Sequence, residues 1–230
     1  MAERSVLVTG GSGGLGGAVV AAFVEAGWRV VVPERTARPS SGPAADELVR
    51  LVADLSEPEG AARAVEAAAG APAAPLRAVV NLAGGYASGG LVHETPIADF
   101  ERMFTVNLRP TYLVTQAALP HLVAAGGGAV VCVAARAAVA PFAGAAGYVT
   151  AKAAVLALAN TVAVEYRSRN VRCNTVLPSV IDTPANRAAQ PDADHSRWVA
   201  PAEIASVIRF LASAESAPTS GATVPVYGRA

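Results

Sequence analysis

The stretch TGGSGGLG, residues 9–16, decides the fold of this chain. An apolar run at 6–8 precedes it, and an amphipathic segment at 15–26 follows it. Glycines at 10, 14 and 16 let the backbone turn tightly out of a strand, approach a pyrophosphate closely and pack the next helix against the sheet. The amino terminus of that helix presents free N–H groups and a positive dipole end, which suit an anion. The stretch therefore predicts a phosphate-binding turn, although such glycines also join strands to helices for steric reasons alone.

Length and composition favour one globular domain with a small-molecule ligand. The 230 residues carry no net charge at pH 7, and 53% of them are hydrophobic, which suffices for a sizeable core. Balanced, sparse charge offers no basic surface for nucleic acid. The chain enters a strand directly, without the apolar core of a signal peptide. Arg136, Pro141 and Lys152 interrupt the apolar stretches, so we expect no membrane span and a cytoplasmic location.

The cysteines and histidines predict no metal site. Cys132 and Cys173 each lie in an apolar run typical of a strand, where buried free thiols behave as small hydrophobic groups. A disulfide between them is the less favoured interpretation. His93, His121 and His195 share no common spacing, and two cysteines with scattered histidines do not make a ligand set.

Predicted strands and helices alternate along the chain, which is typical of a parallel sheet with helices on both faces. We therefore expect an α/β fold, a three-layer doubly wound sheet of seven parallel strands in a single domain. The strands are expected at 5–8, 29–32, 48–53, 78–82, 129–133, 171–177 and 223–226. The helices are expected at 15–26, 57–69, 97–107, 110–125, 147–167 and 202–214.

Four segments are predicted to be irregular. The first, PERTARPSSGPAADE at 33–47, contains three prolines and Ser-Ser-Gly, so the crossover helix usual at this place should be missing or reduced to a turn. The others, 83–95, 134–146 and 178–200, all follow predicted strands. They should therefore gather at the carboxyl edge of the sheet, where a doubly wound fold binds its ligand.

Glu34, which ends the second predicted strand, bears on the choice of coenzyme. It lies roughly twenty residues after the glycines, where a carboxylate accepts the ribose hydroxyls of NAD and repels the 2′-phosphate of NADP. Arg35 and Arg38 favour the phosphate instead, unless they are simply solvated. The sequence favours NAD(H) and leaves NADP(H) possible.

The stretch Tyr148-Val-Thr-Ala-Lys152 is the strongest chemical signal in the chain. It places a phenol and an ammonium one helical turn apart on the same face. A neighbouring cation favours the phenolate, so the pKa of Tyr148 should fall from about 10 towards the working pH. Tyr148 would then both donate and accept a proton. Such a pair also occurs by chance in amphipathic helices, but its place after a strand and a loop favours a catalytic role.

The glycine turn with Thr9 before it, NLAGG at 81–85 and the Tyr148–Lys152 pair together resemble the short-chain dehydrogenase/reductase family over essentially the whole chain. The resemblance implies a Rossmann fold, an NAD(P) cofactor and three catalytic residues: Tyr148, Lys152 and Asn107. Lys152 would also hold the nicotinamide ribose, and Asn107 would anchor the water chain that reprotonates the site.

The same resemblance assigns the coenzyme-binding residues. Asp54 would touch adenine, while Ile181 and Thr183 match positions that contact the nicotinamide carboxamide. Pro178-Ser179 departs from the usual Pro-Gly. The full predicted set comprises Thr9, Gly10, Ser12, Gly13, Gly14, Leu15, Gly16, Glu34, Arg35, Asp54, Leu55, Asn81, Ala83, Gly84, Tyr148, Lys152, Pro178, Ile181 and Thr183.

One catalytic position departs from the family pattern. The family usually places a serine thirteen positions before the tyrosine, where this chain has Ala135. Losing one donor to the substrate oxygen typically costs ~10² to 10³ in rate. Arg136 is a doubtful substitute, because neighbours in an extended segment point to opposite sides. A dihydropteridine-reductase-like branch also carries alanine there, and segments 83–90 and 177–198 resemble it.

These observations predict an NAD(P)H-dependent oxidoreductase that reduces a small electrophilic substrate, whether quinonoid, iminium-like or carbonyl, with Tyr148 as proton donor. The missing serine leaves two alternatives: a non-redox lyase or isomerase, and a catalytically retired binding subunit.

Segment 178–200 is expected to form a substrate lid. Helix 147–167 is apolar on more than one face. Family members commonly associate through this helix and the one before it, 110–125. We therefore expect these two helices to build a homodimer or homotetramer.

Overall fold

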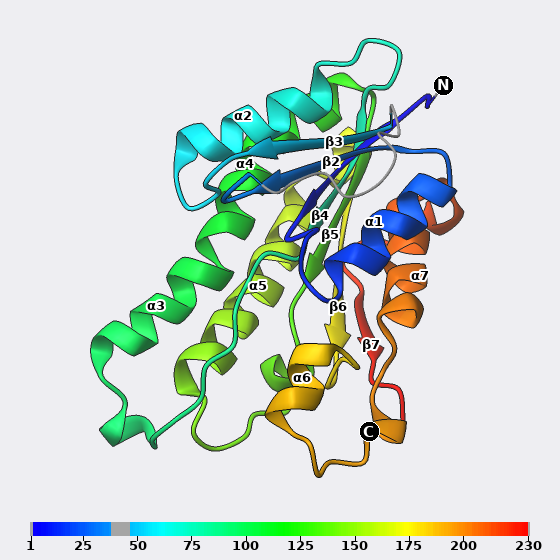
Figure 1. Ribbon diagram of the computed structural model, residues 1–230. Coiled ribbons are helices and arrows are strands. Elements are labelled where there is room, and N and C mark those ends of the chain that lie inside the picture. The colour runs from blue at the N-terminus through cyan, green and yellow to red at the C-terminus, as the bar shows by residue number, and fades with distance from the viewer. Residues whose placement is uncertain (1, 38–46, 230) are drawn as a thin grey trace.

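A sheet of seven parallel strands runs through the protein in the order β3-β2-β1-β4-β5-β6-β7 (Figure 1). The computed structural model describes residues 2–37 and 47–229. The central strands are valine-rich and buried on both faces, as expected of a parallel sheet that helices cover. The strands are β1 Ser5–Thr9, β2 Arg29–Glu34, β3 Leu48–Val52, β4 Leu76–Asn81, β5 Gly128–Val133, β6 Val171–Pro178 and β7 Thr223–Val226.

Helices cover both faces of the sheet and complete three layers. Helices α1 and α7 cover one face, and α2, α4 and α5 cover the other (Figure 1). Side chains alternate along a strand, so Val6 and Val8 pack towards the first face and Leu7 towards the second. The predicted three-layer, doubly wound Rossmann fold is confirmed. The helices are α1 Gly16–Glu25, α2 Pro58–Ala69, α3 Ile97–Asn107, α4 Arg109–Ala124, α5 Ala146–Glu165, α6 Pro184–Ala189 and α7 Pro201–Ala212.

The boundaries of α3 and β7 match the predicted ones, and those of the other predicted elements differ from them by at most two residues. Segment 178–200, expected to be irregular, contains the short helix α6, whose first turn is capped by Thr183. The predicted loss of the crossover helix between β2 and β3 concerns residues 38–46, which lie outside the described residues. On either side of that gap, residues 35–37 and 47 are not helical.

The strand order reverses between β1 and β4, which opens a crevice at their carboxyl ends. The glycine turn leads from β1 into this crevice, and α1 starts there. A Cβ added at Gly16 would lie 2.1 Å from the carbonyl oxygen of Gly10, so only glycine lets the helix begin this close to the turn. The amino terminus of α1 consequently borders the crevice.

Helix α5 is long and apolar enough, by length and composition alone, to cross a membrane. In the structure it packs on the sheet through buried Val155, Ala159 and Ala163, as the core helix of a Rossmann fold does. On its outer side Val164 is 70% exposed. Apolar side chains of α5 therefore lie both in the core and on the exposed side of the helix.

Cys132 and Cys173 are free and buried on neighbouring strands β5 and β6. Both belong to the core between the sheet and helices α2, α4 and α5. Throughout residues 2–37 and 47–229, no three His, Cys, Asp or Glu side chains stand close enough together to hold a metal ion. The thiols thus serve as apolar core groups, as the sequence predicts.

Candidate active site

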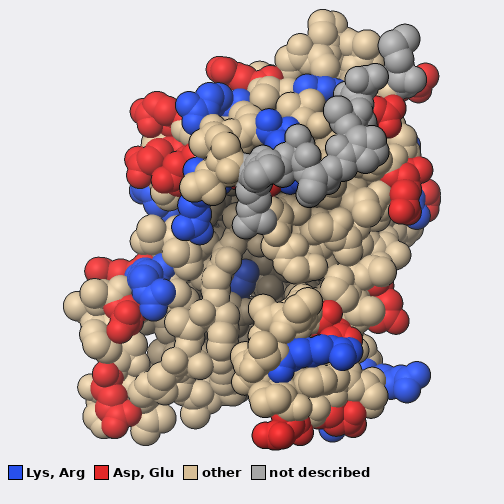
Figure 2. Space-filling view, in the orientation of Figure 1, with Lys and Arg blue, Asp and Glu red and all other residues tan. Residues whose placement is uncertain are grey.

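A cavity of about 760 Å³ opens at the carboxyl edge of the sheet, in the crevice between β1 and β4. Figure 2 shows the molecule hollowed in this region, above α6. Most of the predicted site residues come together in its wall, although they belong to seven separate segments of the chain. They are Gly10, Ser12, Gly13, Gly14, Leu15, Gly16, Glu34, Arg35, Asp54, Leu55, Ala83, Gly84, Asn107, Tyr148, Lys152, Pro178 and Ile181.

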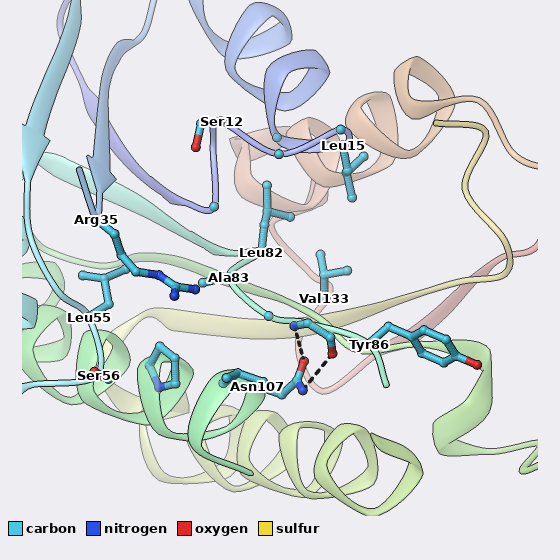
Figure 3. Close-up of a pocket in the computed structure, with 18 of the residues that line it drawn as sticks. Ser12, Leu15, Arg35, Leu55, Ser56, Leu82, Ala83, Tyr86, Asn107 and Val133 are labelled. Atoms are coloured by element: carbon cyan, nitrogen blue, oxygen red, sulfur yellow. Dashed lines mark hydrogen bonds between the residues drawn. The ribbon is translucent and has the colours of Figure 1, made fainter. Parts of the chain in front are cut away.

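One end of the cavity fits the pyrophosphate of a dinucleotide coenzyme. Ser12 and Leu15 lie on the glycine turn at the start of α1 (Figure 3). The first turn of α1 contains no acidic residue, so nothing opposes the positive end of the helix dipole there. A backbone lined by glycines and a cavity of this size leave room for the coenzyme along the sheet edge.

Three predicted coenzyme residues support the wall and do not line the cavity. Thr9 Oγ1 accepts hydrogen bonds from the backbone N–H groups of Leu82 and Ala83, each at 3.0 Å. The buried Asn81 Nδ2 donates to Thr115 Oγ1 at 3.0 Å. Thr183 caps α6 and packs on Gly14, whose added Cβ would lie 2.7 Å from Thr183 Cγ2. Thr9 thus holds the loop after β4, Asn81 ties β4 to α4, and Thr183 fixes the start of α6.

Asn107, the last residue of α3, fastens the loop that follows β4 (Figure 3). Its Nδ2 donates to the carbonyl oxygens of Gly85 and Met103, both at 3.0 Å. Its Oδ1 accepts from the backbone N–H of Gly85 at 3.1 Å. The side chain expected to anchor a water chain is therefore engaged with the protein and sets the shape of the cavity.

Tyr148 and Lys152 lie together on α5, as their spacing predicts. The Lys152 ammonium is buried and donates to the carbonyl oxygen of Val133 at 3.1 Å. Its Nζ lies 6.0 Å from the centroid of the Tyr148 ring. Burial lowers the pKa of Lys152 to about 8, so the side chain still carries its proton at neutral pH.

The predicted fall in the pKa of Tyr148 is wrong for this structure. Burial, with a smaller contribution from the neighbouring Tyr86, raises the pKa of the phenol to about 12. The Tyr86 ring meets the Tyr148 ring edge-on, with centroids 5.0 Å apart. Removal from water thus outweighs the cation of Lys152. Tyr148 is a neutral phenol over the physiological pH range and holds a proton to donate.

Ala135 lines the cavity just beyond β5, where the family pattern expects a serine. Its backbone is extended (φ −161°, ψ 158°) and its side chain is buried. The neighbouring Arg136 is exposed and does not line the cavity; its guanidinium carbon lies 5.1 Å from the centroid of the Tyr227 ring. The structure thus agrees with the expectation that Arg136 is no substitute for the serine.

Several wall residues were not predicted from the sequence. Tyr86 follows the NLAGG stretch, and Ser56 follows Asp54, whose carboxylate accepts from the Ser56 backbone N–H and hydroxyl and has a lowered pKa in consequence. Each missed residue lies within three positions of one that the sequence singled out, so extending every motif by three residues would have found them. The others in the wall include Pro33, Thr36, Ala53, Leu82, Val106, Pro110, Val133, Ala134 and Ser179.

The close approach of Gly84 to Asn107 and Lys152 gives a test of the site. A Cβ added at Gly84 would lie 2.5 Å from Asn107 Oδ1 and 3.3 Å from Lys152 Nζ. We expect Gly84→Ala to displace both side chains, to weaken coenzyme binding about tenfold and to lower the free energy of unfolding by about 1–3 kcal/mol. Isothermal calorimetry and urea unfolding measure these effects.

The matched control for this variant is Gly85→Ala. A Cβ there would lie 3.6 Å from Val106 Cγ2, which is ordinary van der Waals contact. We expect this variant to bind coenzyme within about threefold of the wild type, because it disturbs neither catalytic side chain. Equal effects of the two substitutions would contradict the packing described here.

Comparisons with known proteins agree with this geometry. Residues 4–194 match the family model for short chain dehydrogenase. The chain is 33% identical to 2-(R)-hydroxypropyl-CoM dehydrogenase of Xanthobacter autotrophicus over 245 residues, covering 98% of both chains. It is 33% identical to (3R)-3-hydroxyacyl-CoA dehydrogenase of Mus musculus over 250 residues, covering 96% of this chain and 94% of the relative. The solved structure of ElxO with NADP bound matches with a TM-score of 0.91 at 23% identity, covers 98% of both chains and supports the fold.

Proposed function

Because this chain belongs to the short-chain dehydrogenase family and is an NAD(P)-dependent oxidoreductase, we propose that it reduces a small electrophilic compound with Tyr148 as the proton donor. One observation carries the proposal. Tyr148 and Lys152 line the same cavity as the glycine turn at the start of α1, so a coenzyme bound along the sheet edge would reach both side chains.

The residues of the cavity divide into two groups by role. The glycine turn and the ends of β2 and β3 would hold the adenosine and pyrophosphate, and Lys152 would hold the nicotinamide ribose. When bound, the nicotinamide coenzyme supplies or accepts a hydride. Asn107 keeps the loop at Gly85 in place through three hydrogen bonds, which fixes the wall beside Lys152.

Tyr148 supplies the proton in this proposal. A phenol whose pKa lies near 12 is fully protonated at neutral pH, so it can donate to the oxygen or nitrogen that gains negative charge during reduction. The O–H bond of Tyr148 breaks, the proton goes to the substrate, and a phenolate remains. The nearby Lys152 cation would stabilise that phenolate until solvent returns the proton.

The absence of a hydroxyl at Ala135 bears on the substrate class. With one donor fewer towards the substrate, an unusually electrophilic quinonoid or iminium-like ring would react faster than a simple ketone. The similarity of segments 83–90 and 177–198 to a dihydropteridine-reductase-like branch supports such a ring, whereas the family model and the relatives cited above point to no such branch. The relatives cited above are named for hydroxypropyl and hydroxyacyl compounds, which favours carbonyl substrates instead. We therefore propose both classes as substrates, with the reactive ring as the faster one.

The decisive experiment follows the absorbance of NADPH and NADH over three substrates: a quinonoid dihydropterin, an ortho-quinone and a simple ketone. We expect coenzyme oxidation with at least one of them, fastest with the most electrophilic. Calorimetric titration of the coenzyme alone accompanies the assay. Coenzyme binding without turnover of any substrate would count against a reductase of this class.

A further inference from the structure

An ion pair that the sequence does not reveal lies at the wall of the coenzyme cavity, where Glu34 lines the cavity and Arg50 binds it from outside the lining. Arg50 Nη1 lies 2.6 Å from Glu34 Oε1, and the Glu34 side chain is only 5% exposed. Strands β2 and β3 pair in parallel with Val32 opposite Arg50. Val32 and Glu34 are two residues apart on β2, so their side chains point to the same face of the sheet, and Arg50 opposite Val32 points to that face too. The Arg50 side chain therefore reaches the Glu34 carboxylate on this face. A charge-assisted hydrogen bond of this length compensates the negative charge of the carboxylate.

The surroundings of this pair carry several more cations. Arg35 extends into the cavity past Leu55 towards Ala83 (Figure 3). Arg63 Nη2 donates to the carbonyl oxygen of Val52 at 2.8 Å, and Arg109 Nε donates to that of Ser56 at 2.5 Å. Of these four guanidinium groups, that of Arg50 pairs with the carboxylate of Glu34 and that of Arg35 acts on the carboxylate of Asp54, while Arg63 and Arg109 bind backbone carbonyl oxygens.

We propose that Arg50 determines coenzyme specificity by neutralising Glu34, so that this end of the cavity accepts a 2′-phosphate on the adenosine ribose. The inference rests on the function proposed above. A free carboxylate at the end of β2 would reject that phosphate, but the carboxylate of Glu34 is held by a cation. Arg35 offers the phosphate a planar donor inside the cavity. The protein therefore prefers NADP(H), the reverse of the preference that Glu34 alone predicts.

Coenzyme fragments test this inference without relying on activity. Calorimetry would compare 5′-AMP with 2′,5′-ADP, and NADH with NADPH, at one fixed ionic strength. We expect each phosphorylated member to bind at least about tenfold tighter than its partner, the range of a charge-assisted phosphate contact. Tighter binding of NADH than of NADPH would overturn the inference. Binding of neither coenzyme would overturn both the inference and the proposed function, which keeps the two failures distinguishable.

Variants of Arg50 assign the preference to the ion pair. We expect Arg50→Met to leave a free carboxylate and to shift the NADPH/NADH affinity ratio at least about tenfold towards NADH. Arg50→Lys keeps the charge and should keep the preference for NADPH. Arg63→Met is the matched control, since Arg63 binds a neighbouring backbone carbonyl and does not touch Glu34. An unchanged ratio in Arg50→Met, or an equal shift in Arg63→Met, would overturn the inference.

Glu34→Gln supplies a second variant that keeps the inference testable if Arg50→Met fails to fold. If Arg50 already neutralises Glu34, removing the carboxylate changes NADH affinity by less than about threefold and leaves NADPH the tighter ligand. If the carboxylate instead selects for NADH by binding the ribose hydroxyls, the same substitution weakens NADH tenfold or more. That second result would overturn the inference.

Discussion

Replacing Tyr148 with phenylalanine is expected to lower turnover by about 10² to 10⁴, the usual contribution of a general acid, while coenzyme affinity stays within about threefold. The substitution removes the proton that a phenol with a pKa near 12 holds at neutral pH. It keeps the ring that packs edge-on against Tyr86. Initial rates at saturating coenzyme, together with calorimetric titration of NADPH and NADH, separate the loss of chemistry from a loss of binding.

The control for this prediction is Tyr112→Phe. Tyr112 lies on α4, is about half exposed and does not line the cavity. Its loss of a phenolic hydroxyl should leave both rate and affinity unchanged. An unchanged rate in Tyr148→Phe would remove Tyr148 from the mechanism, and an equal loss in both variants would point to a general effect on folding.

Introducing a hydroxyl at the family's serine position is expected to speed the reduction of a simple ketone. Ala135→Ser would place a donor in the cavity wall on an extended backbone that accommodates serine without strain. We expect a gain of about 10- to 100-fold in kcat/KM for the ketone, because one donor to the developing oxyanion contributes this much or more. A quinonoid substrate, which needs less help, should gain less than about threefold.

Ala138→Ser is the matched control for that variant, since Ala138 lies in the same loop but does not line the cavity. It should leave the rates with ketone and quinonoid substrates unchanged. A ketone rate unaffected by Ala135→Ser would mean that the substrate oxygen does not lie beside residue 135.

The fold and the walls of the site followed from local patterns in the sequence. The glycine turn identified the start of α1, and the alternation of strands and helices identified the sheet, because both signals lie within short stretches. The spacing of Tyr148 and Lys152 placed both on one face of α5 for the same reason. The reversal of strand order between β1 and β4 then brought these distant segments to one crevice.

What the sequence did not predict depends on contacts between distant segments. The pairing of Arg50 with Glu34 requires the register of β2 against β3, and no local pattern encodes it. The direction of the Tyr148 pKa shift depends on how much water the folded chain excludes, which the i, i+4 spacing alone cannot give. The orientation of the Asn81 amide towards Thr115 depends on the packing of β4 against α4.

The order of the strands also divides the cavity between two contiguous parts of the chain. The glycine turn, Glu34 and Asp54 belong to the first three strands and the turns that follow them, whereas Tyr148 and Lys152 come from α5. The residues proposed to hold adenosine thus lie in one part of the chain, ahead of the residues proposed to perform the chemistry. Replacing this first part with that of a relative of opposite coenzyme preference is expected to change which nicotinamide coenzyme the enzyme uses in the cell. The reaction itself should stay the same.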